Sequence, residues 1–367
     1  MTQIQIPGGM RDLLADECLA KENLREKISA VYASYGYRPV ETPLIEFYST
    51  YQNTFTSLKE ETLYKFVDES GQILTLRTDM TLPIARVSVS RFSPDEVPLR
   101  FSYSSSVYKV RQSFAGKRNV VTDCGVELIG LDSRCDLEVL CCALDVMAAL
   151  GDYEYTLEIG SSEFFRTAIR AAGLSSRNAA VLADLVDRKE MPALKAFVSG
   201  LNLTVEQADF FANLPLLCGR RALEKAMDVS FAEELKKEVE SLINLRATLN
   251  ELGYEGRVTF DLGKVPHLDY YTGIIFEGYV QGIGTSVLSG GRYDSLLKKL
   301  GRDMPAIGFG VKLDYLLETA EKPVFSPWKL YYPENRQAEA MVKARELRKE
   351  APVEMIPWQK DTMEVVK

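Results

Sequence analysis

Histidine is the residue that this sequence has least of. His267 is the single histidine among 367 residues, so no histidine cluster can hold a metal ion, and a Ser-His-Asp triad would have to use this one residue. The six cysteines include no C-x-x-C pair. Because the first residues also lack an export signal, we expect no disulfide framework and no bound metal.

Long apolar runs are lacking as well. The longest candidate, residues 139–150, is interrupted by Asp145, and none approaches the ~18 residues that a membrane span needs. Residues 1–7 show no basic segment followed by an apolar one, so we expect no signal peptide, no membrane association and a cytoplasmic location. The formal net charge of −8 gives no support to broad binding of nucleic acid.

Apolar residues are plentiful, at 46% of the chain, and their spacing predicts a mixture of strands and helices. Alternation predicts a strand at residues 37–45 that Pro43 interrupts, and further strands at 257–262, 274–279 and 286–288. It also predicts a hairpin over 63–77 and a long antiparallel hairpin formed by strands at 99–109 and 119–129. Helical spacing predicts helices at residues 16–35, 81–91 and most of 161–250, and a buried stripe at Leu137, Leu140, Cys141, Leu144 and Ala148. Antiparallel strands around a helical middle predict an α+β fold.

The end of the chain has a separate pattern. A linker is expected at residues 322–327, followed by a strand at 328–332, a helix at 336–349 and a strand at 353–358. We therefore expect one domain over residues 1–320, with a helical insertion at about 161–250, and a short α/β module over 322–367.

Two glycine-containing segments are candidates for ligand contact. Ser289-Gly290-Gly291-Arg292 precedes a helix expected from Tyr293, and paired glycines there allow close approach of a ligand and present free N–H groups. A tight turn between a strand and a helix explains the same pattern equally well. Gly308-Phe309-Gly310 is an isolated pair of glycines, which is more typical of packing or turns than of nucleotide binding.

Two acidic residues are predicted to share one face of a strand. Asp123 and Glu127 differ by an even number of residues within a predicted strand, so their side chains point to the same side. Such a pair suits a cleft for a cationic group, such as an amino group or an imidazolium. A solvated sheet face is the alternative explanation.

Several segments, in this order, resemble histidyl-tRNA synthetases, which are class II aminoacyl-tRNA synthetases. Residues 6–12 (IPGGMRD) are similar to the family's N-terminal signature, and Tyr35 to Pro43 to its dimer-forming motif 1. Residues 74–81 (LTLRTDMT) resemble its substrate strand. Residues 268–273 (LDYYTG) and 289–294 (SGGRYD) resemble the segments that mark the histidine-specific members. The resemblance implies an antiparallel sheet flanked by helices.

The sequence departs from this family where ATP would bind. Lys109 and Arg111 stand in place of the arginine and the carboxylate of motif 2, Pro266 in place of an arginine before LDYY, and Tyr315 in place of the arginine of motif 3. A lysine does not reproduce the bidentate fork of arginine, and arginines at a phosphoryl transition state contribute strongly to rate. These degenerate ATP-site positions are expected to abolish adenylation, which leaves no catalytic residue.

The amino-acid side of the same site is better kept. The resemblance implies that the ammonium group of histidine meets Asp79 beside Thr81, and that Glu127 and the two tyrosines read the imidazole, although Asp123 replaces a glutamine. The candidate histidine-binding residues are Asp79, Thr81, Asp123, Glu127, Tyr270 and Tyr271.

Broken ATP chemistry and a retained amino-acid site resemble one related family, the regulatory subunits of ATP phosphoribosyltransferase. The resemblance implies a noncatalytic subunit, without a cofactor, that assembles with a short catalytic subunit in a hetero-octamer, activates it and mediates feedback inhibition by histidine. It also implies a self-dimer through Tyr35 to Pro43. No tRNA is expected as a partner, because residues 322–367 are a truncated counterpart of the anticodon-binding domain.

Two other functions remain open at this point. The chain could be a divergent but active histidyl-tRNA synthetase, if other residues replace the missing arginines. It could instead be a free-standing, synthetase-like sensor that binds another amino acid or an RNA.

Overall fold

A computed structural model describes residues 5–55, 60–110, 118–265, 271–320, 322–323 and 325–367. The chain divides into two compact units, one of residues 1–12 and 21–320 and a second of residues 13–20 and 321–367. Across the described ranges, no helix is both long enough and apolar enough to cross a membrane.

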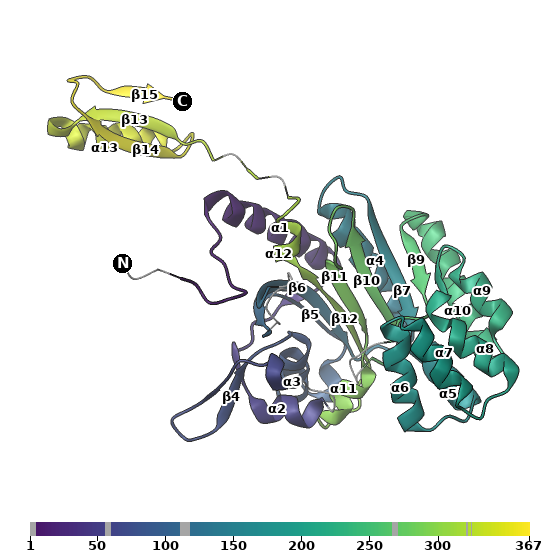
Figure 1. The fold of residues 1–367 in the computed structure, drawn as a ribbon. Helices are drawn as coiled ribbons and strands as arrows, with labels where there is room; N and C mark the ends of the chain where they lie inside the picture. The colour runs from purple at the N-terminus through teal and green to yellow at the C-terminus, as the bar shows by residue number, and fades with distance from the viewer. Residues whose placement is uncertain (1–4, 56–59, 111–117, 266–270, 321, 324) are drawn as a thin grey trace. The chain divides into compact units, whose positions relative to one another are not determined.

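The larger unit is built on a mixed nine-stranded sheet, counted over the described residues (Figure 1). Its strand order is β1-β5-β6-β12-β11-β10-β7-β9-β8. The bounds are β1 Arg38–Pro39, β5 Leu99–Tyr108, β6 Val120–Ile129, β12 Ala306–Lys312, β11 Leu288–Arg292, β10 Ile274–Val280, β7 Tyr155–Ser161, β9 Val258–Asp261 and β8 Cys218–Gly219. Only β1–β5 and β7–β9 are parallel among these pairs. The predicted hairpin of β5 and β6 is confirmed.

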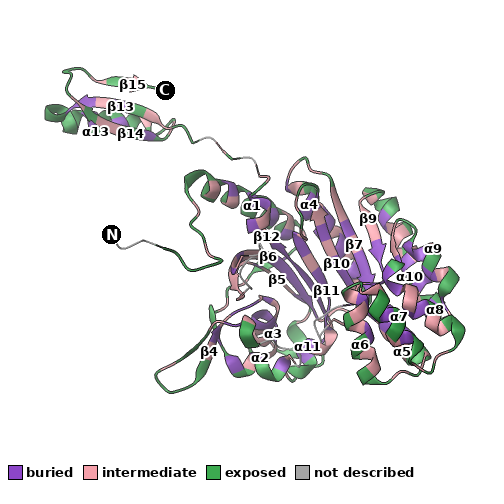
Figure 2. Ribbon diagram, viewed as in Figure 1, coloured by how far each residue is buried: buried purple, intermediate pink, exposed green. Residues whose placement is uncertain are grey.

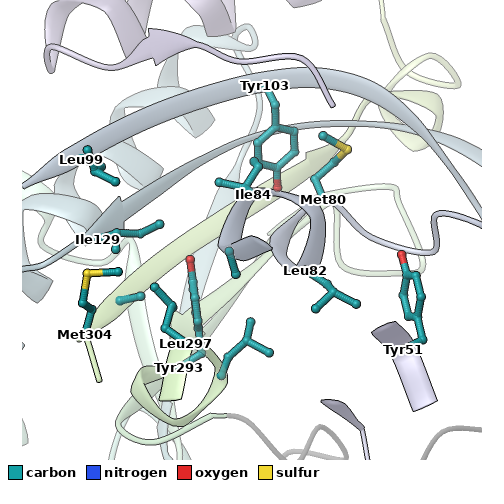
Figure 3. Close-up of a cluster of buried hydrophobic side chains, with 13 residues drawn as sticks. Tyr51, Met80, Leu82, Ile84, Leu99, Tyr103, Ile129, Tyr293, Leu297 and Met304 are labelled. Atoms are coloured by element: carbon teal, nitrogen blue, oxygen red, sulfur yellow. The ribbon is translucent and has the colours of Figure 1, made fainter. Parts of the chain in front are cut away.

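Helices cover both faces of the sheet. On one face, α1 (Ala15–Ser34) packs through Tyr32, whose hydroxyl donates to the carbonyl of Cys124 on β6 and whose ring meets Phe309 of β12 edge-on. On the other face, α2 (Tyr48–Thr54), α3 (Thr81–Arg91) and α11 (Asp294–Lys299) contribute to one buried cluster with Tyr103 of β5 (Figure 3). The central strands are accordingly among the most buried parts of the chain (Figure 2).

The predicted stripe on α4 (Asp136–Ala149) is only partly right. Leu140 and Leu144 are buried, but Leu137 and Cys141 are half-buried and Ala148 is exposed. The buried surface is wider than a stripe and also includes Val139, Cys142, Ala143, Val146 and Met147. The helix is enclosed on more than one side, and such a helix shows no narrow apolar face.

The interrupted strand predicted at residues 37–45 is only partly right, because its two ends belong to different sheets. Only Arg38 and Pro39 pair with β5, and the chain then enters a separate three-stranded sheet through β2 (Ile45–Phe47). In that sheet β2 and β3 (Lys65–Val67) flank β4 (Ile73–Leu76), which confirms the predicted hairpin. Pro43 lies between the two strands and lacks an N–H to donate, so it cannot continue a ladder of backbone hydrogen bonds.

Of the two explanations for residues 289–292, the tight turn is wrong, whereas Ser289 and Gly290 do line the cavity described below. Gly290 and Gly291 lie within β11, where they pair with Phe309 and Gly308 of β12. Their backbone groups belong to the sheet and are not free at the start of a helix, since α11 begins only at Asp294.

The helical insertion follows β7, as predicted. Its helices are α5 (Ser162–Ala171), α6 (Ser176–Asp187), α7 (Met191–Ser199), α8 (Val205–Asn213), α9 (Ala222–Val229) and α10 (Glu233–Leu249). Ser175 and Thr204 cap α6 and α8 through their hydroxyls. The rings of Phe164, Phe210 and Phe231 pack together in its core, with centroids 5.1 and 5.7 Å apart.

The smaller unit contains the predicted strand, helix and strand, with a third strand that was not predicted. These are β13 (Trp328–Pro333), α13 (Gln337–Leu347), β14 (Val353–Trp358) and β15 (Glu364–Val366), in the sheet order β14-β13-β15. Leu330, Ala340 and Ala344 form the centre of its core.

Candidate functional site

A cavity of about 180 Å³ opens on the sheet in the larger unit, beside the start of α3. Residues from β5, β6, β11 and β12 line it, together with the segments that join them. Four of the predicted ligand residues line this one cavity, namely Asp79, Thr81, Asp123 and Tyr271. Residues far apart in the sequence are therefore brought together as predicted. Tyr270 lies outside the described residues.

Asp79 is fixed at the start of α3. Its Oδ1 accepts from the backbone N–H of Leu82 at 2.9 Å, and its Oδ2 accepts from the hydroxyl of Thr78 at 2.9 Å. A carboxylate at this position satisfies a free N–H of the helix and interacts favourably with the helix dipole. Asp79 thus has a structural role as a cap as well as a place in the cavity wall.

Glu127 does not line the cavity but lies directly behind it. The residue is only 1% exposed, and its carboxyl accepts hydrogen bonds from the hydroxyls of Tyr293 and Thr81, both of which line the cavity. Burial raises the pKa of Glu127 to about 8, although these two hydrogen bonds oppose the rise. At neutral pH the group is therefore a protonated acid that can both donate and accept a hydrogen bond.

Asp123 lines the cavity with an unsatisfied oxygen. Its Oδ1 is buried and has no hydrogen-bond partner. Burial raises the pKa of Asp123 to about 6, opposed by the positive charges of Lys312 and Lys109. A buried acceptor without a partner costs free energy, and such a group calls for a donor from a ligand or from water.

Two glycines of β12 make room for these acids. Gly308 pairs with Glu127 in the β6–β12 ladder, whereas Gly310 pairs with Gly125, two residues along β6 from Asp123. A Cβ atom at Gly308 would overlap the carboxyl of Glu127, and one at Gly310 would overlap the carboxyl of Asp123. The Gly308-Phe309-Gly310 pattern is thus a packing feature, as predicted, but one that builds the site. The strand itself was not predicted, because its glycines weaken the apolar alternation of residues 306–312.

The degenerate ATP-site positions meet the same cavity where the structure describes them. Lys109 and Tyr315 both line it, whereas Arg111 and Pro266 lie outside the described residues. Arg118 and Lys312 also line the cavity. Neither was predicted as a site residue, because both come close to the cavity only through the pairing of β6 with β12. The cavity therefore carries positive charge beside its acids.

Tyr271 and Arg292 hold the wall of the site in place. The ring of Tyr271 lies against Gly291, where a Cβ would come within 2.8 Å of it, and the Tyr271 carbonyl accepts from Arg166. Arg292 is buried and paired with Asp136 and Asp294. Arg292 is thus a structural anchor and not a ligand-binding group.

Comparison with known proteins identifies the family to which this fold belongs. The family model of histidyl-tRNA synthetase matches residues 9–316. The ATP phosphoribosyltransferase regulatory subunit of Acetivibrio thermocellus is 35% identical over 324 residues, which is 87% of this chain and 77% of that protein. The regulatory subunit of Bacillus mycoides is 33% identical over 345 residues, covering 91% and 81%.

Solved structures give the same result. A crystal structure described as an ATP phosphoribosyltransferase regulatory subunit/histidyl-tRNA synthetase from Bacillus halodurans has a TM-score of 0.87 at 32% identity, covering 97% of this chain and 93% of the other. A histidyl-tRNA synthetase from Nostoc sp. has a TM-score of 0.78 at 19% identity, covering 99% and 88%, which shows the fold alone.

The fold is that of a histidyl-tRNA synthetase-like protein of the class II synthetase type. Within that class, the chain belongs to the family of ATP phosphoribosyltransferase regulatory subunits.

Proposed function

We propose that this chain is the noncatalytic regulatory subunit of an ATP phosphoribosyltransferase and that it binds histidine in the cavity beside α3. It assembles with a short catalytic subunit, in a complex that we take to be a hetero-octamer. In that complex it activates its partner and mediates feedback inhibition by histidine. Its relatives, which are named as ATP phosphoribosyltransferase regulatory subunits, support the regulatory role.

The observation that carries the histidine assignment is the pairing of Asp79 and Asp123 in one cavity, with Oδ1 of Asp123 buried and unpaired. Carboxylates in a partly buried cavity attract an ammonium group more strongly than they do in water, because their charge is less screened there. The α-ammonium group of histidine would bind at Asp79.

The imidazole would then lie toward Glu127, Thr81 and Tyr271, with Tyr270 as a further expected contact. A protonated Glu127 suits a neutral imidazole, since that ring carries one donor and one acceptor nitrogen. The hydroxyl of Tyr293, which also lines the cavity, donates to the carboxyl of Glu127 and fixes its position.

The absence of catalysis is inferred from two other residues of the cavity wall. Lys109 and Tyr315 line the cavity at positions where the resemblance to histidyl-tRNA synthetases implies arginines. A tyrosine carries no charge to hold a phosphate, and a lysine offers a point charge without the planar fork. We therefore assign the chemistry of the complex to the catalytic partner.

Asp79→Asn and Asp123→Asn test the assignment, with Asp303→Asn as a matched control. Asp303 is an exposed aspartate paired with Lys298 and is not part of the cavity wall. Calorimetry on the full chain should show histidine affinity about ten- to a hundredfold lower in the two cavity variants, the range for a lost charge-assisted hydrogen bond.

In the reconstituted complex, the same variants should need correspondingly more histidine for inhibition, because coupling between two sites is reciprocal. The uninhibited rate of the partner should change little. Unchanged histidine inhibition in both cavity variants would place the effector site elsewhere.

A further inference from the structure

The cavity contains a second buried polar atom without a partner, and this one is a donor. Nη1 of Arg118 is buried and makes no hydrogen bond to any described residue, and the same holds for Oδ1 of Asp123. Both residues line the same cavity. An unsatisfied donor and an unsatisfied acceptor in one cavity indicate a ligand that carries both an anionic and a cationic group.

The guanidinium of Arg118 is held in position by acids at its edge. Its Nη2 donates to Oε1 of Glu318 at 3.2 Å, and its Nη1 lies 3.6 Å from Oδ1 of Asp314 without forming a hydrogen bond. Asp314 is already engaged, because it accepts from the backbone N–H of Thr122 and pairs with Lys21 at 3.4 Å. Arg118 is thus oriented by the protein while part of its donor capacity remains unused.

The other two cations among the described residues of the cavity wall, Lys109 and Lys312, are less suited to bind a carboxylate. Lys109 and Lys312 lie close enough to Asp123 for their charges to act on it. Both are ammonium groups, which bind as point charges, whereas a guanidinium presents two parallel N–H groups to the two oxygens of a carboxylate. Arg118 is therefore the group best suited to recognise a planar anion.

We propose that Arg118 binds the free α-carboxylate of the amino acid in this cavity, while Asp123 accepts from a nitrogen of the same ligand. The assignment rests on the proposed function, since it takes the ligand to be histidine. It makes the site selective for the free amino acid over derivatives that lack the carboxylate charge. Arg118 is then the residue that lets the subunit sense the end product itself and not its neutral analogues.

Calorimetry with three probes tests this selectivity on the full chain. The probes are L-histidine, L-histidinol and L-histidinamide, of which only histidine carries the carboxylate. The wild-type chain should bind histidine about ten- to a hundredfold more tightly than the other two. Arg118→Gln should lower histidine affinity to the level of histidinol and leave histidinol affinity unchanged.

Two further variants separate recognition from folding. Arg134→Gln removes an exposed arginine that pairs only locally with Asp132, and it should keep the full preference for histidine. Arg118→Lys keeps the charge near Glu318 but not the fork, and it should lose most of the preference. It also gives a readout if Arg118→Gln does not fold. A merely structural role for Arg118 would weaken all three probes equally, which would overturn the proposal.

The remaining outcomes distinguish this proposal from the proposed function. If the wild-type chain binds histidine and Arg118→Gln keeps the same preference over histidinol, the Arg118 assignment is wrong and the histidine site stands. If the wild-type chain binds neither histidine nor histidinol, both proposals fail. If ATP or inorganic phosphate binds to the wild-type chain and only that binding is lost in Arg118→Gln, the anion is a phosphate and the carboxylate assignment is overturned.

Discussion

Glu127 on β6 lies directly opposite Gly308 on β12, and its carboxyl occupies the space in which a side chain at residue 308 would stand. Gly310 instead pairs with Gly125, but the carboxyl of Asp123 likewise occupies the space in which a side chain at residue 310 would stand. The two glycines allow both acids to fold over the neighbouring strand while the ladder continues beneath them. The acidic part of the cavity therefore depends on two strands that are far apart in the sequence.

Replacing Gly308 by alanine should displace the carboxyl of Glu127, and replacing Gly310 should displace that of Asp123. The new methyl group overlaps a carboxyl, and overpacking of a well-packed site costs about 1–3 kcal/mol in the free energy of unfolding. We expect Gly308→Ala and Gly310→Ala to lower both stability and histidine affinity, as measured by urea unfolding and calorimetry. Gly284→Ala is the control, because an added Cβ there meets nothing within 4 Å. Equal behaviour of all three variants would contradict the packing argument.

The raised pKa of Glu127 predicts that stability falls as the pH rises. Burial raises this pKa from 4.5 to about 8, so between these values the folded chain keeps a proton that the unfolded chain has lost. The free energy of unfolding then decreases with increasing pH, by up to about 1.4 kcal/mol per pH unit, and levels off above the folded-state pKa. Asp123 acts in the same direction between 3.8 and about 6.

Glu127→Gln should remove the larger part of this dependence, because glutamine is neutral at every pH. The variant should unfold at similar urea concentration to the wild type near pH 5 and at higher concentration near pH 9. Parallel slopes for the two proteins between pH 6 and 8 would show that Glu127 is already ionised in the folded chain.

Alternation of apolar residues was enough to predict the central hairpin. β5 and β6 follow it over ten residues each, and Asp123 and Glu127 share a face as their even spacing requires. Helix α3 coincides with its prediction, since capping and apolar spacing are local properties. These elements are encoded within a few neighbouring residues.

The strand and the cavity residues that were not predicted depend on contacts between segments that are distant in the sequence. β12 was not predicted because Gly308 and Gly310 contribute no apolar side chains, and their purpose is visible only against β6. Arg118 and Lys312 reach the cavity only because β6 and β12 are neighbours in the sheet. The role of Tyr293 as the donor to Glu127 depends on the same sheet order. Pro43 predicted an interrupted strand but not a change of sheet.

The chain should show no ATP–pyrophosphate exchange that depends on histidine. Lys109 and Tyr315 lie at the cavity in place of arginines, and a transition-state arginine contributes about 10³–10⁵ in the rate of phosphoryl chemistry. A histidyl-tRNA synthetase serves as the positive control. The combined variant Lys109→Arg, Pro266→Arg, Tyr315→Arg need not rescue exchange, because Arg111 also replaces a carboxylate. Exchange above the background without protein would identify the chain as an active synthetase.

The chain should form a homodimer through the segment from Tyr35 to Pro43 and the small sheet that follows it. β1 is an edge strand of the large sheet, so its outer side is free to meet another chain. In the small sheet, Glu46 and Thr75 point inward, whereas Phe47 and Phe66 lie on the opposite face and are 49% and 39% exposed. An exposed apolar face of this kind is typical of a protein–protein contact.

Phe47→Lys should therefore convert the dimer to a monomer, because it places a charge in an apolar interface and leaves the buried face of the sheet untouched. Val205→Lys is the matched control, since Val205 is 79% exposed on the helical insertion and outside the small sheet. Sedimentation velocity at micromolar concentration measures both variants beside the wild type. A wild-type chain that sediments as a monomer would overturn the predicted dimer, and a dimer that survives Phe47→Lys would move its interface away from the small sheet.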